Sequence, residues 1–334
     1  MKKKLAAIAL SLCLLLSMAG CGGGSSAPAG SDSENGLTKV SMAFCTWTGY
    51  APMFIAQEEG FFKDKGIDME IQVIEDESTY ASLITNGQIQ FLATAQDPNI
   101  KMFANGANSR YVLTMDKSFG ADALVAGADI KTLDDLKGKT VALDKSASSY
   151  YFFLKALEDG STLKEEDINV QDMGDTTEAG VAFMGGQVDA AIMWEPELSE
   201  ALDEVEGAHT VVTSKDYPDT ISDSLVVNTA FAEENPDIVE AVAECWYEAI
   251  DYMKENPEKA NELMASGFEE VTAEDIANDI NGLEFIGREE NTALNDESNE
   301  ENIFAICQEM AAFWMSKGEC ETDDLTEYFA LIKK

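Results

Sequence analysis

Aromatic and acidic side chains occur together at several points of this sequence. Trp47 and Tyr50 are three residues apart, Trp194 is followed directly by Glu195, and Asp97 precedes a proline. An aromatic face attracts a positively charged group, and a nearby carboxylate balances its charge. This combination favours a flat or cationic ligand, such as an amine, a guanidinium or an aminopyrimidine.

Hydroxyl groups indicate a second, competing chemistry. Ser148 and Ser149 stand at the start of a predicted helix, and Tyr150 follows them. Backbone N–H groups at a helix start can hold an anion without any arginine, so these residues favour a sulfonate, taurine or nitrate. N-capping is their other possible role. Adjacent helical residues do not share a face, and we prefer Tyr150 over Tyr151 as the residue that faces the ligand.

Residues that catalysis usually needs are scarce. The chain has one histidine, His209, and two arginines, Arg110 and Arg288. Arg110 precedes an apolar run, at the amino end of a predicted strand and away from the expected site. The sequence contains no Gly-x-Ser-x-Gly or His-Glu-x-x-His motif. We therefore expect a binding protein without cofactor or metal, and not an enzyme.

The N-terminus has the three-part plan of a secretory signal, with three lysines, an apolar run and small residues before Cys21. Met18-Ala19-Gly20-Cys21 resembles the bacterial lipobox, which implies cleavage before Cys21 and lipidation of its thiol. An ordinary signal peptide is the alternative. Residues 21–37 are rich in glycine and serine and predict a flexible tether. We expect a mature protein outside the cytoplasm, anchored to the membrane by lipid.

The formal net charge is −41, with acidic residues spread along the chain. Such a body repels nucleic acid and anionic lipid, so neither is an expected partner. Four cysteines follow the tether, without a Cys-x-x-Cys pair. We expect Cys45 and Cys245 to be buried thiols, whereas Cys307 and Cys320 could form a disulfide.

Strand and helix patterns alternate along the chain and predict two α/β lobes with mainly parallel sheets. Ligands bind at the carboxyl ends of such strands, where the loops 96–98 and 194–196 are expected to face each other across a cleft. From Asn235 the pattern is helical, with 291–301 predicted as a loop. The expected strands are 40–45, 67–73, 89–93, 140–143 and 188–193; the expected helices are 52–59, 78–86, 148–157, 178–184, 236–253, 302–316 and 325–332, with another opening at Pro257.

Three motifs together resemble one protein family. They are Trp47-Thr48-Gly49-Tyr50-Ala51-Pro52, Asp135-Leu136-Lys137-Gly138-Lys139-Thr140, and Gly186-Gln187-Val188-Asp189-Ala190-Ala191 followed by Trp194-Glu195-Pro196. The chain resembles the substrate-binding proteins for nitrate, sulfonates, taurine and thiamine-precursor pyrimidines. The resemblance spans residues 39 to 260. It implies a type II periplasmic-binding-protein fold, whose two lobes close on a ligand.

The resemblance also implies domains and partners. Lobe 1 would hold residues 38–125 and 225–334, lobe 2 would hold 126–224, and hinge strands would lie near 113–125 and 222–228. Asp223 would then lie beside the second hinge crossing and join the candidate ligand-binding residues. The implied partners are a small solute and the permease and ATPase of an ABC importer, and the protein would be a monomer. A ligand-sensing lipoprotein is the alternative role.

Overall fold

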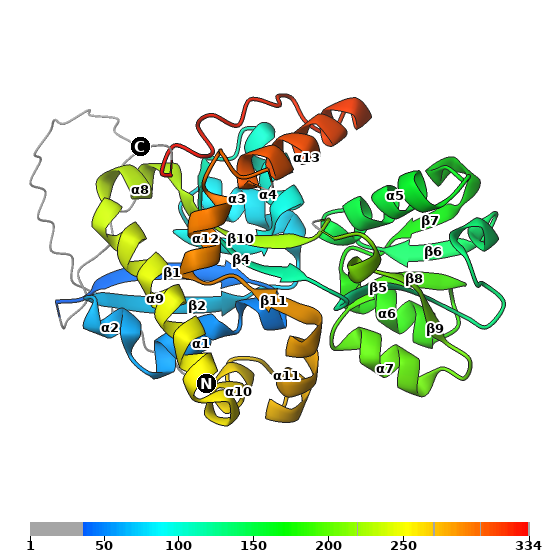
Figure 1. Ribbon diagram of the computed structural model, residues 1–334, viewed down its shortest axis with the longest axis horizontal. Coiled ribbons are helices and arrows are strands. Elements are labelled where there is room, and N and C mark those ends of the chain that lie inside the picture. Colours follow the sequence, from blue (N-terminus) through cyan, green and yellow to red (C-terminus); the bar gives the residue numbers. More distant parts are fainter. Residues whose placement is uncertain (1–35, 219, 270, 301, 333–334) are drawn as a thin grey trace, which may run out of the picture.

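The computed structural model describes residues 36–218, 220–269, 271–300 and 302–332 and divides them between two α/β lobes (Figure 1). The predicted signal peptide, Cys21 and most of the predicted tether lie outside the described residues. No helix within the described ranges is long and apolar enough to cross a membrane.

Lobe 1 is built on a six-stranded sheet in the order β11-β4-β10-β3-β1-β2. β1 pairs in parallel with β2 and β3, whereas β10 runs antiparallel between β3 and β4. The parallel part places the carboxyl ends of β1 and β3 at one edge of the sheet. The strands are β1 (Thr38–Phe44), β2 (Ile67–Val73), β3 (Phe91–Ala95), β4 (Ser109–Ser118), β10 (Ser222–Asn228) and β11 (Leu283–Phe285).

Lobe 2 is built on a five-stranded sheet in the order β7-β6-β8-β5-β9. Its strands are β5 (Asp122–Ala126), β6 (Thr140–Leu143), β7 (Asn169–Asp172), β8 (Ala190–Trp194) and β9 (His209–Thr213). Because β5 pairs with β8 and β9, and β10 pairs within lobe 1, the chain crosses between the lobes at residues 119–121 and again between the end of β9 at Thr213 and the start of β10 at Ser222. Both crossings precede the boundaries expected at 125/126 and 224/225, since β5 and β10 each belong whole to one sheet.

Helices cover both sheets, and most form where the sequence pattern predicts them. Pro52, Pro236 and Pro257 each open a helix at its first position, where the missing N–H costs no hydrogen bond. The helices are α1 (Pro52–Glu58), α2 (Phe61–Asp64), α3 (Tyr80–Thr85), α4 (Gln96–Ala104), α5 (Ser148–Gly160), α6 (Thr176–Met184), α7 (Glu197–Glu204), α8 (Thr229–Glu234), α9 (Pro236–Glu255), α10 (Pro257–Ala265), α11 (Ala273–Asp279), α12 (Arg288–Leu294) and α13 (Ile303–Lys317).

Three predicted segments are wrong in detail. Residues 96–98, expected as a loop, form the first turn of α4, where a proline is tolerated. Residues 291–294, also expected as a loop, form the last turn of α12. The Asn291 side chain holds them there, because its amide oxygen accepts from the backbone N–H of Thr114 and its amide nitrogen donates to the Thr114 carbonyl. Residues 325–332 form turns instead of a helix. They are held there because the Tyr328 carbonyl accepts from the backbone N–H of Tyr111 in β4.

The four cysteines after the tether, Cys45, Cys245, Cys307 and Cys320, are all free and buried. The possible disulfide between Cys307 and Cys320 is therefore not formed. Cys307 lies on the buried face of α13, and burial raises the pKa of its thiol. These thiols pack as small apolar side chains.

The helix α13 lies beside α4 (Figure 1), and its side chains contact both lobes. It packs against α4 of lobe 1, and Trp314 contacts Tyr150 and Tyr151 of α5 in lobe 2, with ring centroids 5.7 and 5.8 Å apart. The ammonium of Lys101 in α4 lies 4.3 Å from the Trp314 ring centroid. α13 is therefore a third connection between the lobes, beside the two chain crossings.

Candidate functional site

A small cavity of about 20 Å³ lies between the lobes, near the carboxyl ends of β1, β3 and β8. Its walls are mainly aromatic and acidic, and they come from both lobes and from the second crossing. No lysine, arginine or histidine is among the described residues that line it. The lining residues are Cys45, Trp47, Tyr50, Glu77, Ala95, Asp122, Ser148, Trp194, Ile221 and Asp223.

Two tryptophans meet across this cavity. Trp47 follows β1 in lobe 1, and Trp194 is the last residue of β8 in lobe 2. Their rings lie edge to face, with centroids 6.2 Å apart and planes at 76°. This is a favoured geometry for aromatic pairs. The two lobes are thus in direct contact at the cavity wall.

A pair of aspartates lies beneath Trp47 and Tyr50. Asp223 on β10 stands directly opposite Asp116 on β4 in the strand register. Trp47 Nε1 donates to Asp116 Oδ1 at 3.2 Å, and the Tyr50 hydroxyl donates to Asp223 Oδ1. The Oδ2 atom of each aspartate is buried without a hydrogen-bond partner. Burial, together with the charge of Asp223, raises the pKa of Asp116, and burial raises the pKa of Asp223 to about 7.

Gly49 makes the close approach of Trp47 to Asp116 possible. A Cβ atom at this position would overlap with Asp116 Oδ2 and Trp47 Nε1. Only glycine lacks that atom. The motif Trp47-Thr48-Gly49-Tyr50 therefore has a local structural reason: two aromatic donors reach the aspartate pair from either side of a residue without a side chain.

Two more carboxyl groups face the cavity. Asp122, the first residue of β5, is 1% exposed, its Oδ2 has no partner, and burial raises its pKa to about 7. Glu77 accepts a hydrogen bond from Thr94 Oγ1 at 3.1 Å. Loss of solvent raises the pKa of Glu77 to about 8, and the charge of Asp144 in lobe 2 adds to the effect.

Ser148 is the point where α5 reaches the cavity. Just before it, Asp144 Oδ1 accepts from both the backbone N–H and the hydroxyl of Ser146, each at 2.7 Å. Donors close to the start of α5 thus already serve a carboxylate of the protein itself.

The structure brings together five of the nine candidate residues, namely Trp47, Tyr50, Ser148, Trp194 and Asp223. The other four, Asp97, Ser149, Tyr150 and Glu195, do not line the cavity. Asp97 lies in the first turn of α4, where burial raises its pKa to about 7 despite the opposing charge of Lys101. Ser149 is fully buried, with its hydroxyl 3.5 Å from that of Thr176.

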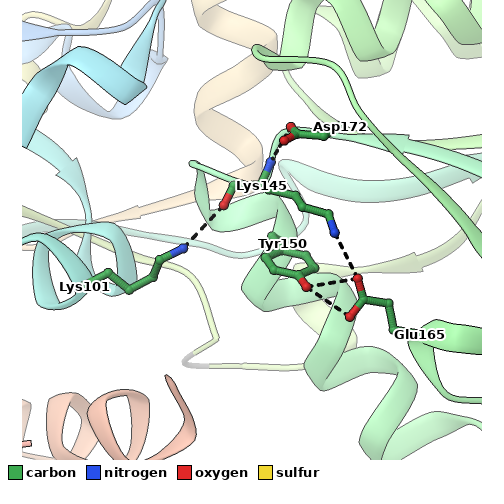
Figure 2. Close-up of polar contacts among 5 residues, drawn as sticks. All are labelled: Lys101, Lys145, Tyr150, Glu165 and Asp172. Carbon is green, nitrogen blue, oxygen red and sulfur yellow. Dashed lines mark hydrogen bonds and ion pairs between the residues drawn. The ribbon is translucent and has the colours of Figure 1, made fainter. Parts of the chain in front are cut away.

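Tyr150 points toward Glu165 (Figure 2) and is not among the residues that line the cavity. Its hydroxyl donates to both Glu165 oxygens at 3.0 Å, and the Lys145 ammonium lies 4.7 Å from its ring centroid. Lys101 of lobe 1 also reaches the backbone oxygen of Lys145 at 3.4 Å. The preference for Tyr150 as a cavity residue is therefore wrong, because this turn of α5 faces α13 and the loop with Glu165.

Glu195 caps the helix that follows it. Its carboxylate accepts from the backbone N–H and the hydroxyl of Ser199, each at 3.0 Å. A carboxylate at a helix start stabilises the unpaired N–H groups there. Glu195 thus has a structural role, although its charge still raises the pKa of Asp122.

Sequence reasoning missed Glu77, Asp116 and Asp122 as residues of this site. One signal was present, since Asp116 ends the apolar run Tyr111–Met115 of a predicted strand. A carboxylate in such a strand is costly to bury unless it has a function or a partner. Glu77 and Asp122 carried no comparable signal, because each is one of many acidic residues beside a predicted element.

Residues 47–260 match the family model described as NMT1/THI5 like. The chain belongs to the NMT1/THI5-like family. The match covers more than half of the chain, includes all three motifs that carry the resemblance, and confirms the predicted family. Within this NMT1/THI5-like segment lie nine of the ten residues that line the cavity, all except Cys45.

Two curated relatives illustrate how far the sequence similarity extends. A binding protein of Brucella abortus is 25% identical over 213 residues, or 63% of this chain and 65% of the relative. An aliphatic sulfonates-binding protein of Escherichia coli is 31% identical over 181 residues, or 54% and 56%. The chain thus spans less than two thirds of the length of each of these two relatives.

Solved structures share the fold. The periplasmic aliphatic sulphonate binding protein SsuA from Escherichia coli superposes with a TM-score of 0.68 at 21% identity, covering 87% of this chain and 98% of SsuA. The nitrate-binding protein NrtA from Synechocystis gives 0.66 at 16%, covering 89% and 85%. The predicted periplasmic-binding-protein fold is therefore confirmed. The desulfurization enzyme DSZB also has it, with a TM-score of 0.62 at 13% and coverages of 88% and 97%, so the fold alone does not define the activity.

Proposed function

We propose that this protein is the extracytoplasmic solute-binding component of an ABC importer and that it captures a small, positively charged nitrogen compound between its lobes. One observation carries the choice of solute. Asp122 and Asp223 line the cavity, are at most 2% exposed, and each has a carboxyl oxygen without a partner. Buried carboxylates need a cation or a proton, and a cationic solute would supply the missing donors.

The aromatic walls fit the same class of solute. Trp47 and Trp194 border the cavity together with Tyr50. With the lobes in this position the cavity has room for about one water molecule, so the two indole rings must move apart to admit a solute. A cation that binds between an aromatic face and a carboxylate gains from both. Amines, guanidinium compounds and protonated aminopyrimidines have these properties.

An anion is the second candidate, and the comparisons favour it over a cation. Relatives and solved structures are named for aliphatic sulfonates and for nitrate. The cavity chemistry argues the other way for this chain. Acidic side chains dominate its walls, basic ones are absent from its described lining, and Asp144 already takes donors near the start of α5.

Capture would proceed by closure of the lobes. In the open form, Trp47, Tyr50 and Asp223 present one wall, and the second lobe closes with Asp122 and Trp194. Closure excludes water, which strengthens each charge interaction in the cavity. A solute that contacts both lobes binds the closed form more tightly and shifts the population toward it. The closed form would then dock on the permease, and the ATPase would drive uptake.

The proposal includes an export signal at residues 1–20 and lipidation of Cys21, with a monomeric binding protein on the outer face of the membrane. Replacement of Cys21 by serine should abolish palmitate labelling and release the protein from membranes. Labelled, membrane-bound Cys21→Ser protein would contradict the anchor.

The proposed role also requires that the solute leaves chemically unchanged. Recovery of the intact solute after binding would distinguish this role from that of an enzyme.

A titration panel tests the solute class. Isothermal titration calorimetry would compare benzylamine, benzamidine and an aminopyrimidine with taurine, an alkanesulfonate and nitrate. We expect binding of the cations, lost on Asp223→Asn, and a raised melting temperature through linkage. Binding of the anions alone would refute the cationic solute and leave the importer role with the anion candidate. A permease gene beside this one would favour transport over the sensing alternative.

A further inference from the structure

The aspartate pair of lobe 1 is an unusual arrangement inside a sheet. Asp116 and Asp223 are direct partners in the register of β4 and β10, and they are 0% and 2% exposed. Like charges that face each other on neighbouring strands destabilise a sheet. Removal from water increases their repulsion further. The pair therefore cannot hold two negative charges without compensation.

The hydrogen bonds of the pair supply only part of that compensation. Trp47 and Tyr50 each donate one neutral hydrogen bond, to Asp116 Oδ1 and Asp223 Oδ1 respectively. The two Oδ2 atoms have no partner outside the pair. Two neutral donors stabilise the charge of one carboxylate better than that of two.

The groups around the pair add negative charge, not positive charge. Asp122 of β5 and Asp223 both raise the pKa of Asp116. Other titratable groups face the pair from the residue after β1 and from η1 (Thr48–Tyr50), η2 (Glu77–Thr79) and α4, and they are Cys45, Tyr50, Glu77 and Asp97. No lysine, arginine or histidine of the described chain is among the strongest influences on Asp116, Asp122 or Asp223.

Resting on the proposed function, we infer that Asp116 and Asp223 share one proton in the empty protein and release it when a cationic solute binds. Two adjacent carboxyl groups that cannot both ionise behave in this way elsewhere. The solute's positive charge takes the place of the proton, which leaves to the solvent. The net charge of the cavity is then the same before and after binding. The acidic pair thus makes the site selective for cations over neutral analogues.

The exchange predicts a measurable proton count. Calorimetric titration with benzamidine in phosphate and in Tris, buffers of different ionisation enthalpy, should give about one proton released per benzamidine bound near pH 6.5. Affinity should rise with pH by up to about tenfold per pH unit below the apparent pKa of the pair. Benzamide, the neutral analogue, should bind weakly and release no proton.

Two variants and one spectroscopic signal separate the possible outcomes. Asp116→Asn should lower the proton release toward zero and flatten the pH dependence, because the amide carries no exchangeable charge. Glu197→Gln is the control: burial also raises the pKa of Glu197 in α7, but this residue does not line the cavity and is not among the strongest influences on Asp116 or Asp223, so this variant should keep the proton release. In the unsubstituted protein, the infrared C=O band of protonated carboxyl groups should lose intensity on benzamidine binding, and this measurement does not depend on whether the variants fold.

Each failure has its own meaning. Benzamidine binding with no proton release, or with an unchanged carboxyl infrared band, would overturn the exchange and leave the cationic solute in place. Absence of binding by benzamidine and benzylamine, with binding of taurine or nitrate, would overturn the cationic solute class itself.

Discussion

The ring of Trp47 in lobe 1 meets the ring of Trp194 in lobe 2 edge to face, with centroids 6.2 Å apart. One residue follows the first strand of the first sheet, and the other ends a strand of the second sheet. This contact couples the distance between the lobes to the shape of the cavity. A solute that enters between the two rings would therefore contact both lobes.

Replacement of Trp194 by alanine should weaken solute binding by about 2- to 30-fold, which corresponds to ~0.5–2 kcal/mol for a cation over an aromatic face. The melting temperature should change little, because Trp194 is only half-buried and ends its strand. Benzamidine titration and thermal unfolding would measure both quantities. Trp194→Phe keeps an aromatic face and should lose less affinity. An unchanged affinity of the alanine variant would remove Trp194 from the site.

Replacement of Gly49 by alanine should lower benzamidine affinity by more than tenfold. The new Cβ would overlap with Asp116 Oδ2 and Trp47 Nε1, so the loop and the aspartate must separate. The free energy of unfolding should fall by about 1–3 kcal/mol, as for other overpacked sites. Gly127→Ala is the control, because a Cβ there meets no atom within 4 Å. Equal behaviour of the two variants would contradict the close approach at Gly49.

The ligand-free protein should become more stable as the pH falls from 8 to 5. The pKa of Asp122 is about 7 in the folded chain and about 4 in an unfolded one, so the folded state binds more protons between these values. Stability is then lost as the pH rises toward 7. We expect the melting temperature to be at least ~2 °C higher at pH 5 than at pH 8.

Asp122→Asn provides the control for this pH dependence. The amide cannot ionise, so the variant should have a flatter profile and a higher melting temperature than the unsubstituted protein at pH 8. A melting temperature that rises with pH in the unsubstituted protein would show that its buried carboxyl groups are stabilised as anions, against the assignment made here.

Replacement of Lys101 by methionine should favour the open lobes. Lys101 lies over the Trp314 ring of α13 and bonds to the Lys145 carbonyl of lobe 2. Loss of these contacts, worth about 0.5–1 kcal/mol, should weaken binding about two- to fivefold. Small-angle scattering should show a larger radius of gyration without solute. Lys254→Met is the control, because Lys254 pairs with Asp251 on the surface of lobe 1. If the Lys101→Met variant kept its radius of gyration and its solute affinity, α13 would have no role in closure of the lobes.

Local patterns in the sequence were sufficient for much of the fold. The strict alternation at Ile67–Val73 and the apolar strand Thr140–Leu143 coincide with β2 and β6, and the helix opened by Pro236 coincides with α9. These elements depend on nearest neighbours along the chain, since alternation and proline placement act within a few residues. The paired lobes follow from the repeated order of such elements.

Some residues of the candidate site could also be predicted from the sequence, and others could not. Trp47, Tyr50 and Trp194 could be found from the sequence because they follow strands whose carboxyl ends face the cleft. The pairing of Asp223 with Asp116 could not be predicted, because these residues are more than one hundred positions apart and meet only through the antiparallel register of β10 with β4.

Residue type and local order thus determined the family, the two lobes and the aromatic walls of this protein. Only the tertiary structure decided which acids share the cavity and that α13 connects the lobes, because burial and long-range register exist only once the chain is packed.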